Sequence, residues 1–590
     1  MTALDRHYRR WLLLIWLASA ATIIAMSWSA IQNWHFPDPD DAMRLAEVRD
    51  WMAGQSWFDV SQHRMNLPAG LSMHWSRWLD VPLAALIALF KPLLGQRIAE
   101  TVAMVAVPMA TLGATQALVA EIARRRAGAA AGLVAAAFCM VSIGTWYAMR
   151  PLRIDHHGWQ IVAGLGLVFA LLAKRDWRGG AIAGLCAAAW AHISLEGLAF
   201  TAGAAAWLGL RWIGSPVERY RLPAFLATLV AAEAMLYFSV HGFSLIGQTF
   251  CDQVSPVHLA ALGTAALLTF AIARMGPRSL PVRLSTMAVA ALMTGALYRF
   301  CAPQCATGPF ATLGPLGYHL WYLNVPEGVP LWHLDHDLAL LWGLFPWIGL
   351  AGALVACLRR SPDRAGTIDY AALLAIGTVI AMVVTRAGAF ANLLAIPGAI
   401  TLILILLDRT EAWPMPVRVL TRALAILALC PAGAGVAAML ATKPAPQSAA
   451  SAAKTDPKCG LAYSLRPLDA LPQTTILAPL DMGPTLLIGT HQAAVTGPYH
   501  RDPAALEDVL RFFTAKDAYA IALRRHASYV AFCPGDGEMA AMAKFAPDGL
   551  AAALLHDRVP SWLQPVPLPG AAGLKLYHVS STGNSAAFVP

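Results

Sequence analysis

The stretch that decides the fold is residues 98–147, IAETVAMVAVPMATLGATQALVAEIARRRAGAAAGLVAAAFCMVSIGTWY. It contains two long apolar runs, 98–122 and 129–147, separated by the three arginines at 124–126. About 20 apolar residues suffice to cross a bilayer as a helix, and arginines collect in the loops on the cytoplasmic side. The stretch therefore predicts two membrane-spanning helices joined by a cytoplasmic turn.

The whole chain shares this apolar character. Of its 590 residues, 58% are hydrophobic and 13% are charged, whereas a soluble domain carries about 25% charged residues. The net charge of +9 could indicate a nucleic-acid partner. However, the basic residues fall in short clusters between apolar segments, where membrane topology places them. We therefore expect a multi-spanning protein of the lipid bilayer with no nucleic-acid partner.

The basic clusters also predict the topology. The first apolar run, 11–31, follows three arginines and lacks a convincing cleavage site, so we interpret it as a retained helix with a cytoplasmic N-terminus. Every second loop after it is basic, which is the positive-inside pattern. The pattern predicts about thirteen helices within residues 1–440 and a bacterial inner-membrane location. The clusters that mark cytoplasmic loops lie at 124–126, 174–178, 211–221, 274–283, 359–364 and 409.

The alternate loops are polar and would share the periplasmic side. In the first of them, 42–52 has the pattern of a helix, and 81–94 is apolar but short for a span, which predicts a helix at the membrane interface. The active site and the C-terminal tail are expected on this side. The four periplasmic segments are 34–97, 150–157, 301–337 and everything after 441.

The last part of the chain changes in composition. Residues 441–458 are rich in Ala, Ser and Pro and predict a linker, after which 459–590 mixes strand-like and helical segments. The predicted fold is a multi-spanning α-helical membrane protein with a small C-terminal α/β domain in the periplasm. The expected strands are TTILAPL (474–480), ASYVAFCP (527–534) and LKLYHV (574–579), and the expected helix is 503–526.

Five of the nine cysteines fall on the predicted periplasmic side, where disulfides persist. Cys459 with Cys533 would staple the terminal domain, and Cys301 with Cys305 would close a loop. The sequence alone does not fix the pairing.

Ionisable side chains at the membrane face are costly to hold, so clusters of them are candidates for function. The first cluster is HFPDPDDAMR, residues 35–44. Asp40 could simply cap the helix that follows, but three carboxylates in four residues repel one another unless a cation lies nearby. We interpret Asp40 and Asp41 as candidate catalytic acids, Asp40 also as a metal ligand, and Arg44 as a residue that lines the same cavity.

The second cluster is RPLRIDHH, residues 150–157, which joins two apolar runs and leaves no room for a solvated loop. Asp155 and His157 can offer a carboxylate oxygen and an imidazole nitrogen to one divalent ion. His156 can line the cavity beside them. The alternative is an ordinary polar turn.

Arginines on the same side are candidates for binding a phosphate. Arg386 lies at the outer end of an apolar helix, where a lone guanidinium needs an anion such as a lipid phosphate; snorkelling to the headgroups is the alternative. Arg150 and Arg153 could help to bind that phosphate. His192 and Glu196 flank a nearby turn and could line the same cavity, or join neighbouring helices by a hydrogen bond.

The third acidic element is Glu327 in WYLNVPEG, residues 321–328, within the longest outer loop. It is a candidate catalytic residue, although it could be an ordinary solvated acid. Carboxylates together with a histidine suit Mg²⁺ or Mn²⁺, and a cation facing a phosphate neutralises charge on a leaving group. Because nucleotide-activated donors are cytoplasmic, a polyprenyl-linked sugar is the natural substrate on this side.

On these motifs the chain resembles the GT-C glycosyltransferases, and among them the catalytic subunit of oligosaccharyltransferase, including the single-subunit bacterial and archaeal enzymes. DDAMRLAEVRDWMAG, residues 40–54, is similar to the family's first outer-loop motif. The resemblance implies that Asp40 binds metal and approaches the acceptor, and Asp155-His-His157 is like the second acidic motif, which holds the metal. It further implies that Glu327 orients the acceptor and that Arg386 contacts the donor phosphate.

The resemblance implies metal-dependent transfer of a sugar or oligosaccharide from a polyprenyl phosphate or pyrophosphate to a periplasmic acceptor. The Trp-Trp-Asp-Tyr-Gly motif, with which those enzymes read an acceptor sequon, is absent, and Asp481-Met-Gly-Pro and Pro498-Tyr-His-Arg501 occupy its region. The acceptor is therefore open between a protein, a glycan and a lipid. Two rival functions are transfer from a polyprenyl-monophosphate sugar to lipid A or polysaccharide, and flipping of a lipid-linked sugar, although transporters place charges near the bilayer midplane.

Overall fold

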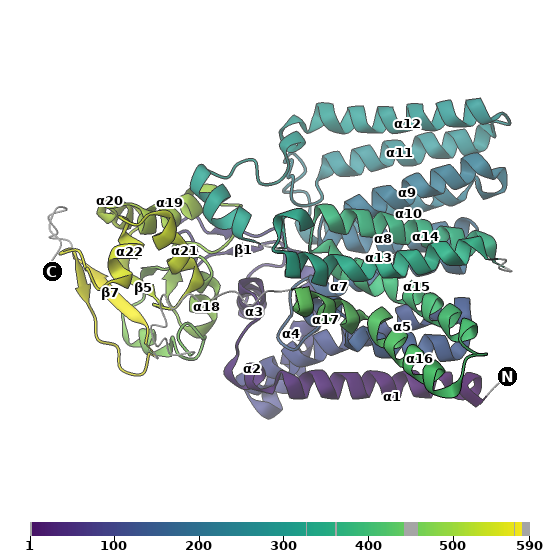
Figure 1. Cartoon of the computed structure of the whole chain (residues 1–590). Coiled ribbons are helices and arrows are strands. Elements are labelled where there is room, and N and C mark those ends of the chain that lie inside the picture. The colour runs from purple at the N-terminus through teal and green to yellow at the C-terminus, as the bar shows by residue number, and fades with distance from the viewer. Residues whose placement is uncertain (1–2, 326, 360–362, 442–457, 572, 581–590) are drawn as a thin grey trace.

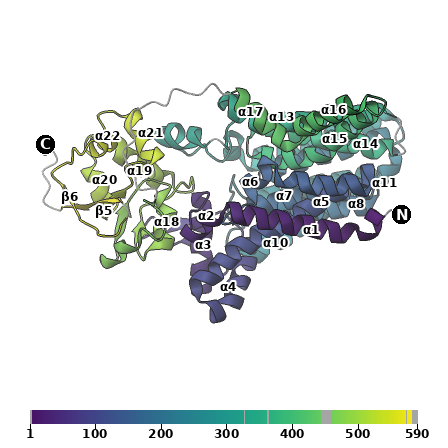
Figure 2. The ribbon, with the colours of Figure 1, turned by 60° about the horizontal axis from the view of Figure 1, so that its bottom comes forward.

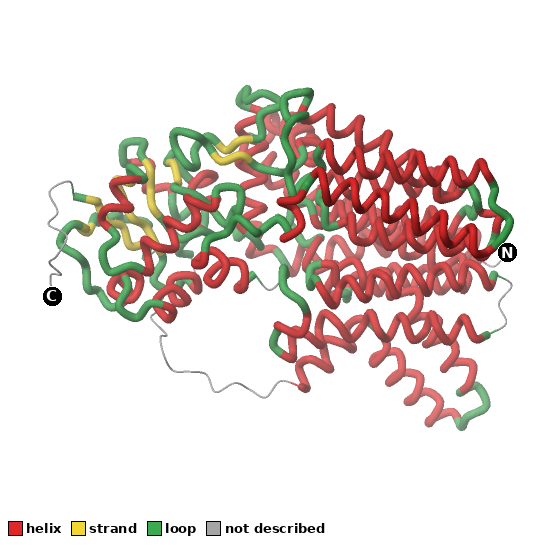
Figure 3. Tube along the Cα trace, turned by 90° about the horizontal axis from the view of Figure 1, so that it is seen from above, coloured by secondary structure: helices red, strands yellow, loops and turns green. Residues whose placement is uncertain are grey.

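The structure, a computed structural model, describes residues 3–325, 327–359, 363–441, 458–571 and 573–580. A bundle of long helices makes up most of the molecule, and a smaller domain of mixed helices and strands lies at one end of it (Figure 1). The N-terminus lies at the opposite end of the bundle. Seen from above, the two parts are distinct in secondary structure, with loops concentrated where they meet (Figure 3).

The bundle is a multi-pass membrane domain. Eight helices of the described residues are long and apolar enough to cross a membrane, or nine if the bent pair α16 and α17 forms one span. The predicted number of about thirteen spans stays a prediction. The helices of the bundle, which include α7, α8 and α9 besides these candidate spans, are α1 (Ala3–Met26), α5 (Gln96–Met140), α7 (His157–Ala173), α8 (Trp177–Ile193), α9 (Gly197–Gly214), α10 (Arg221–His241), α11 (Pro256–Met275), α12 (Leu280–Cys301), α13 (His336–Leu358), α14 (Arg364–Val383), α15 (Ala387–Arg409), α16 (Met415–Leu429) and α17 (Pro431–Ala441).

The stretch 98–147 forms two helical segments, as its two apolar runs predict. The first run and residues 129–140 of the second lie within α5, which breaks at Gly128, where φ is 87° and ψ is 177°. The end of the second run forms a separate short helix, α6 (Ile143–Ala148). These dihedrals are open to glycine and strained for other residues. The break directly follows the arginines at 124–126, so the basic cluster marks the turn between the two halves of α5.

Helix α15 occupies the centre of the bundle and is buried along most of its length. It packs so closely on α13 that a Cβ atom on Gly398 would lie 2.2 Å from the carbonyl oxygen of Gly349. Close contact through small residues is the usual way in which membrane helices associate. The position of α15 matters for the site because Arg386 directly precedes it.

The last apolar stretch of the bundle, residues 415–441, is divided into two helices. Two helices, α16 and α17, meet there at an angle of 81°. The break falls at Cys430 and Pro431. A proline disfavours helical dihedrals in the residue before it and cannot donate a backbone hydrogen bond, so the helix ends at this point.

Short elements connect the bundle to the second domain. They are α2 (Trp28–Asn33), α3 (Pro39–Met52), β1 (Ser61–Gln62), β2 (Leu71–Ser72), η1 (Arg77–Leu79), α4 (Asp80–Leu94), α6 (Ile143–Ala148), η2 (Pro216–Glu218), η3 (Pro303–Thr307), η4 (Gly317–Trp321), η5 (Tyr322–Asn324) and η6 (Leu331–His333). The helices predicted at 42–52 and 81–94 correspond to α3 and α4. Helix α4 projects from the side of the bundle (Figure 2) and exposes several leucines, as Leu89 and Leu93 show.

Helix α3 lies between the bundle and the second domain, and its residues from Asp41 to Val48 are buried. Asp38 caps it by accepting a hydrogen bond from the Asp40 amide at 3.0 Å. Capping is therefore the role of Asp38, and the Asp40 carboxyl is not needed for it. At the other end of α3, Arg49 Nη1 donates to the carbonyl oxygen of Ile488 at 2.7 Å, which ties α3 to the second domain.

The second domain is a small α/β unit. Its five-stranded sheet has the order β4-β3-β5-β7-β6, in which β3 is parallel to β4 and β5, and β7 is antiparallel to β5 and β6. The elements are η7 (Arg466–Ala470), β3 (Thr475–Leu477), α18 (Met482–Gly489), β4 (Ala493–Ala494), α19 (Pro503–Thr514), α20 (Tyr519–Arg524), β5 (Ala527–Phe532), α21 (Gly537–Phe545), α22 (Leu550–Leu555), β6 (Leu563–Pro565) and β7 (Lys575–Val579).

The sequence predicts part of this domain correctly. Strands β3, β5 and β7 lie within the three predicted ranges, whereas β4 and β6, of two and three residues, are too short to give a pattern. The expected helix 503–526 is two helices, α19 and α20. The domain limits 1–440 and 459–590 stay predictions, and the linker predicted at 441–458 falls almost entirely outside the described residues.

Two disulfides are present, and both involve segments near the second domain. Cys459 pairs with Cys533, as one of the candidate pairings has it, but Cys305 pairs with Cys251 and not with Cys301. Cys301 ends α12 and is exposed and free, whereas Cys305 lies after the helix and faces the loop between α10 and α11. The Cα atoms of Cys251 and Cys305 are 5.2 Å apart.

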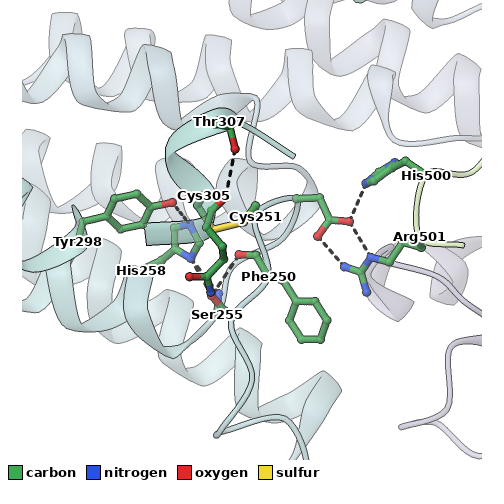
Figure 4. Close-up of a disulfide and its surroundings, with 11 residues drawn as sticks. Phe250, Cys251, Ser255, His258, Tyr298, Cys305, Thr307, His500 and Arg501 are labelled. Carbon is green, nitrogen blue, oxygen red and sulfur yellow. Dashed lines mark hydrogen bonds and ion pairs between the residues drawn. A yellow bond between two sulfur atoms is a disulfide. The ribbon is translucent and has the colours of Figure 1, made fainter. Parts of the chain in front are cut away.

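The disulfide at Cys251 lies beside an ionic contact between the bundle and the α/β domain (Figure 4). Arg501 forms two hydrogen bonds to the Asp252 carboxylate, at 2.6 and 2.8 Å. His500 Nε2 contacts the same carboxylate at 2.9 Å. Asp252 is mostly buried, with 11% of its side chain exposed, so this contact is a strong link between the two parts.

The substitution Asp252→Asn tests this link. It keeps the size of the side chain but leaves Arg501 without its carboxylate in a mostly buried place, so we expect a loss of about 3 kcal/mol of stability. The measurement is the Tm of the detergent-solubilised protein. Asp548→Asn is the control, because its ion pair with Lys516 is exposed on both sides and contributes little. Equal Tm values for the two variants would contradict the assignment.

The same link predicts a pH dependence. Burial alone would raise the pKa of Asp252, but the hydrogen bonds from His500 and Arg501 outweigh it and hold the pKa below its ordinary 3.8. A depressed pKa stabilises the fold above the unfolded-state value and loses that contribution as the pH falls below it. The Tm difference between wild type and Asp252→Asn should therefore be constant between pH 6 and 8 and shrink in acid below about pH 4.

Candidate functional site

The predicted site residues come from segments far apart in the chain, and most of them gather at the end of the bundle next to the α/β domain. This end holds the start of α3, the turn before α7, the loop between α12 and α13, and the start of α15.

Asp41 organises the turn before α7. Its Oδ1 accepts hydrogen bonds from the backbone amides of Ile154 and Asp155, at 2.8 and 3.0 Å. Its Oδ2 lies 3.2 Å from Arg153. Because Asp41 is fully buried and both oxygens are engaged in this way, its observed contacts hold the turn in place against α3.

Arg153 is the central cation of the site. Its guanidinium lies 3.1 Å from Asp38, 3.2 Å from Asp41 and 3.2 Å from Asp155. The same group lies over the Tyr147 ring, 5.1 Å from its centroid. The guanidinium therefore compensates the carboxylates of α3 and of the turn, which would otherwise repel one another in a buried place.

Asp155, His156 and His157 form the candidate metal centre. These three buried side chains can each offer a ligand atom, and the three atoms lie within 4.8 Å of one another. Nδ1 of His156 and both ring nitrogens of His157 are buried without a hydrogen bond among the described residues. Unsatisfied buried nitrogens beside a carboxylate suit a divalent cation of borderline softness. The group includes His156 and leaves out Asp40, so a metal role for Asp40 stays a prediction.

Glu327 is held beside this centre. The Tyr147 hydroxyl donates a hydrogen bond to its Oε2, and His157 Nε2 lies 3.9 Å from the same oxygen. Arg386 Nη2 lies 3.6 Å from Oε1, and the Arg386 amide donates to the Glu327 carbonyl oxygen at 2.9 Å. The loop that carries Glu327 is thus fixed to the start of α15, and Glu327 is not an ordinary solvated acid.

The carboxyl groups differ in their tendency to ionise. Burial raises the pKa of Asp40 well above its usual range, and the negative charges of Asp38, Asp155 and Glu327 raise it further. Burial also opposes ionisation of Asp155, but Arg153 and the neighbouring imidazoles outweigh it and lower its pKa.

The pKa of Glu327 is also lowered, well below its usual range, because Arg386 and then His157 outweigh the effect of burial. At neutral pH the site therefore offers the carboxylates of Asp155 and Glu327. It also offers Asp40 as a group that can hold a proton. Acids with pKa values pushed apart in one site are typical of acid–base catalysis.

Arg386 faces a cavity whose empty space, counting the part that is open to solvent, is about 390 Å³. Tyr147, His157 and Glu196 also line it, and Trp190 and Phe390 supply an apolar wall. Arg386 Nη1 donates to Glu196 Oε1 at 2.5 Å. A cation against an apolar wall is the combination that a lipid-linked phosphate requires, since the phosphate needs a guanidinium and the lipid needs hydrocarbon.

The other predicted residues lie elsewhere. Arg44 belongs to α3, is fully buried 2.9 Å from Asp80 and 3.4 Å from Glu47, and does not line the Arg386 cavity. Arg150 is half-buried near Arg153, and its Nε has no hydrogen-bond partner among the described residues. His192 bonds to Glu233 at 3.0 Å and lines a second cavity, so it and Glu196 do not share one.

Two residues of the site were not predicted from the sequence. Asp38 pairs with Arg153, and Tyr147 donates to Glu327. Asp38 precedes a proline at the start of a helix, which is a capping signal that could have been read from the sequence. Tyr147 lies at the end of a predicted apolar run. Tyrosine is common at such positions because its amphipathic ring suits the membrane–water interface, so no sequence signal distinguishes Tyr147.

Known proteins were compared with the chain. No family model and no curated protein sequence matches it, but solved structures do. The oligosaccharyltransferase AglB of Archaeoglobus fulgidus, in complex with an inhibitory peptide and a dolichol-phosphate, gives a TM-score of 0.66 at 15% identity, covering 99% of this chain and 76% of that chain.

Two further structures of an Archaeoglobus fulgidus oligosaccharyltransferase are similar. The apo form gives a TM-score of 0.67 at 15% identity, covering 98% of this chain and 76% of that one. The complex with zinc and sulfate gives 0.60 at 16% identity, covering 96% and 73%. Identity at this level establishes the fold alone. That fold is the one that the resemblance implies: the chain shares the architecture of the archaeal oligosaccharyltransferase.

Proposed function

We propose that the protein transfers a sugar or oligosaccharide from a polyprenyl phosphate or pyrophosphate to an acceptor, with the help of a divalent cation. The observation that carries the proposal is that Asp155, His157, Glu327 and Arg386 meet at one end of the bundle. The similar archaeal oligosaccharyltransferases supply independent support, because one was solved with a dolichol-phosphate and an inhibitory peptide. One of them also holds zinc and sulfate.

The cation would be held by Asp155, His156 and His157, with Asp40 close by. A set of one carboxylate and two imidazoles suits Mn²⁺ better than Mg²⁺, which prefers oxygen ligands. A bound cation would supply positive charge toward the phosphate that leaves when the sugar is transferred. Arg153 keeps Asp155 ionised and therefore ready to bind a cation.

Arg386 would bind the donor phosphate, and the apolar wall of its cavity would receive the first isoprene units. Arg386 is also the residue from which α15 starts, so the phosphate would lie near the positive end of a helix dipole. Arg153 is already occupied by three aspartates, which makes Arg386 the stronger candidate of the two. Arg150, whose Nε is unpartnered among the described residues, is available as a second cation.

Glu327 would orient the acceptor, because Tyr147, His157 and Arg386 fix its position. Asp40 would accept the proton of the attacking group in its ionised form, because its raised pKa makes the carboxylate a stronger base. Asp41 would act by holding the turn that presents Asp155. The acceptor stays open between a protein, a glycan and a lipid, since no sequon-reading motif is present.

The site would face the periplasm of a bacterial inner membrane, with the N-terminus in the cytoplasm. Both disulfides lie at the same end of the molecule as the α/β domain, and disulfides persist in oxidising compartments. The arginines at 124–126 mark the break in α5 at the other end, as the positive-inside rule expects.

The rival functions are separable by experiment. A flippase would move a labelled lipid-linked sugar across a vesicle bilayer without breaking the sugar–phosphate bond. A transferase using a polyprenyl-monophosphate sugar would accept that donor and reject the pyrophosphate. Mass spectrometry of the lipid-linked glycans that accumulate without the protein distinguishes the two.

The variant Asp155→Asn tests the metal centre. The amide keeps the shape but loses the charge that a divalent cation needs, so we expect a fall of more than about 100-fold in both Mn²⁺ affinity and sugar transfer. Mn²⁺ binding is measured by electron paramagnetic resonance, and transfer by the release of radiolabelled sugar from the donor.

The control for this experiment is Asp557→Asn, an exposed residue of the α/β domain that pairs with Lys575. This control should match wild type in both measurements. Normal Mn²⁺ binding and turnover in Asp155→Asn would remove the metal centre from the proposal.

Arg386 and Glu196 offer a pair of variants with opposite expected effects. Arg386→Ala removes a charged hydrogen-bond donor to the phosphate, and the donor KM should rise about 10- to 100-fold. Glu196→Gln removes a negative charge that competes for the same guanidinium, and the donor KM should fall several-fold. Both constants come from initial rates with varied donor, and the acceptor KM should not change. Shifts of the same sign in the two variants would contradict phosphate binding at Arg386.

A further inference from the structure

A second cavity lies beside the candidate site and shares no lining residue with the Arg386 cavity. Its empty space, counting the part that is open to solvent, is about 250 Å³. The side chains that matter for its chemistry are His74, Trp75, His192, Tyr237, His241 and Gln253. They come from the loop before η1, from α8, from α10 and from the loop after α10.

Several buried polar atoms in this cavity have no hydrogen-bond partner among the described residues, although His74 Nδ1 lies 4.0 Å from an Asp252 carboxylate oxygen. They are Nδ1 of His74, Nε2 of His192, the Tyr237 hydroxyl and Nε2 of Gln253. Tyr237 is only 1% exposed and Gln253 only 7%. Buried polar groups are nearly always satisfied in native proteins. Four such atoms around one cavity therefore indicate a ligand that supplies the missing hydrogen bonds.

Contacts with neighbouring residues hold the lining side chains of this cavity in place. His192 Nδ1 bonds to Glu233 Oε1 at 3.0 Å, which fixes the ring while its Nε2 stays unpartnered. Glu233, Tyr237 and His241 recur every four residues along α10, so they share one face of that helix. Glu233 is fully buried, and burying an ionisable side chain among membrane helices is costly. Such a residue is a candidate for function, and here it holds His192 in place.

The opposite wall connects the cavity to the candidate site. The Trp75 ring lies 6.3 Å from the His156 ring, centroid to centroid, and His156 is one of the candidate metal ligands. Arg44 lies over the Trp75 ring at 4.7 Å and fixes its orientation. A ligand in the cavity would thus be one side chain away from the metal centre.

The lining chemistry points to a neutral, hydroxylated ligand. None of the described residues that line the cavity is an Asp, Glu, Lys or Arg, so the cavity offers no fixed charge to a phosphate or an ammonium group. Its three histidines are not among the described side chains that could jointly hold a metal ion. Imidazole, phenol and amide groups beside the Trp75 ring are instead what sugar hydroxyls and the apolar face of a sugar ring require.

We propose that this cavity is a subsite for a sugar ring of the lipid-linked donor. The inference rests on the proposed function and adds the place where the sugar is recognised. His192 and Glu196 flank the short turn between α8 and α9, His192 in this cavity and Glu196 in the cavity of Arg386. A donor with its phosphate at Arg386 would have its sugar within reach of His192. The subsite thereby sets which sugars are transferred.

The test uses the full-length protein and two variants, Tyr237→Phe and Gln253→Met. Each removes a polar group that has no partner in the free protein, so neither should lower the Tm. With the intact donor, kcat/KM should fall about 3- to 10-fold, which is the loss of one hydrogen bond. The acceptor KM should not change. Tyr463→Phe is the matched control, because it also removes an unpartnered buried hydroxyl, but in the α/β domain.

A panel of donors that each lack one sugar hydroxyl makes the test specific. For the donor that lacks the hydroxyl bound by Tyr237, wild type and Tyr237→Phe should have equal rates, whereas they differ for the other donors. This loss of difference identifies a direct contact, which a purely structural role of Tyr237 would not produce.

Other outcomes would overturn the proposal. If wild type transfers sugar but both variants match the control with every donor, the subsite is wrong and the proposed function stands. A change confined to the acceptor KM would overturn the assignment to the donor. A lowered Tm with unchanged rates would show that the groups are structural. If wild type moves no sugar from any lipid-linked donor, the proposed function falls and the subsite falls with it.

Discussion

The contact on which the rest of the site depends is that of Arg153 with three aspartates. Asp38 and Asp41 come from the start of α3, and Asp155 from the turn before α7. Without a cation among them, these carboxylates would repel one another and could not be buried side by side. Arg153 therefore allows two segments more than a hundred residues apart to share one buried place. The candidate metal ligands, Glu327 and Arg386 are all arranged around that place.

This arrangement separates two tasks that a single guanidinium could not perform. Arg153, engaged with three carboxylates, fixes the acids and keeps Asp155 ionised. Arg386 pairs with Glu196 and Glu327 at the edge of a cavity, where an incoming anion can exchange with the partly exposed Glu196. A carboxylate that is partly exposed to solvent is easier to displace than a buried one, because the released carboxylate regains its hydration. Arg153 thus stabilises the fold of the site, and Arg386 is available to bind a ligand.

The sequence predicted those features that depend on local composition. Arginine clusters predicted turns because a cluster and its turn are neighbours in the sequence. The break at Gly128 directly after residues 124–126 is an example. The acidic motifs were found because Asp155 and His157 are close in the chain, and their burial follows from the apolar runs on either side. The proline at 431 is a local signal for a bend. Because the segments on both sides of Pro431 are apolar, however, they resemble one continuous membrane helix.

Features that depend on three-dimensional contacts were not predictable in this way. The proline after Asp38 marks it as a cap, but its ion pair with Arg153 depends on how α3 packs against the turn before α7, which the local sequence does not show. Cys305 pairs with Cys251 since the loop after α10 lies beside it, although Cys301 is closer in the chain. His192 and Glu196 flank one short turn yet enter different cavities, which only the packing of α8 and α10 decides.

The contact of α3 with α18 has a consequence for how the molecule is made. Arg49 and its partner carbonyl at Ile488 are separated by 439 residues, so α3 leaves the ribosome long before the helix that covers it exists. The bundle can enter the bilayer while its most acidic helix is still bare and hydrated. Since domains form in the order of translation, the candidate site is completed only when the last fifth of the polypeptide has emerged, folded and docked. A nascent chain that stalls earlier would be an inserted but uncovered bundle, which quality-control proteases can recognise.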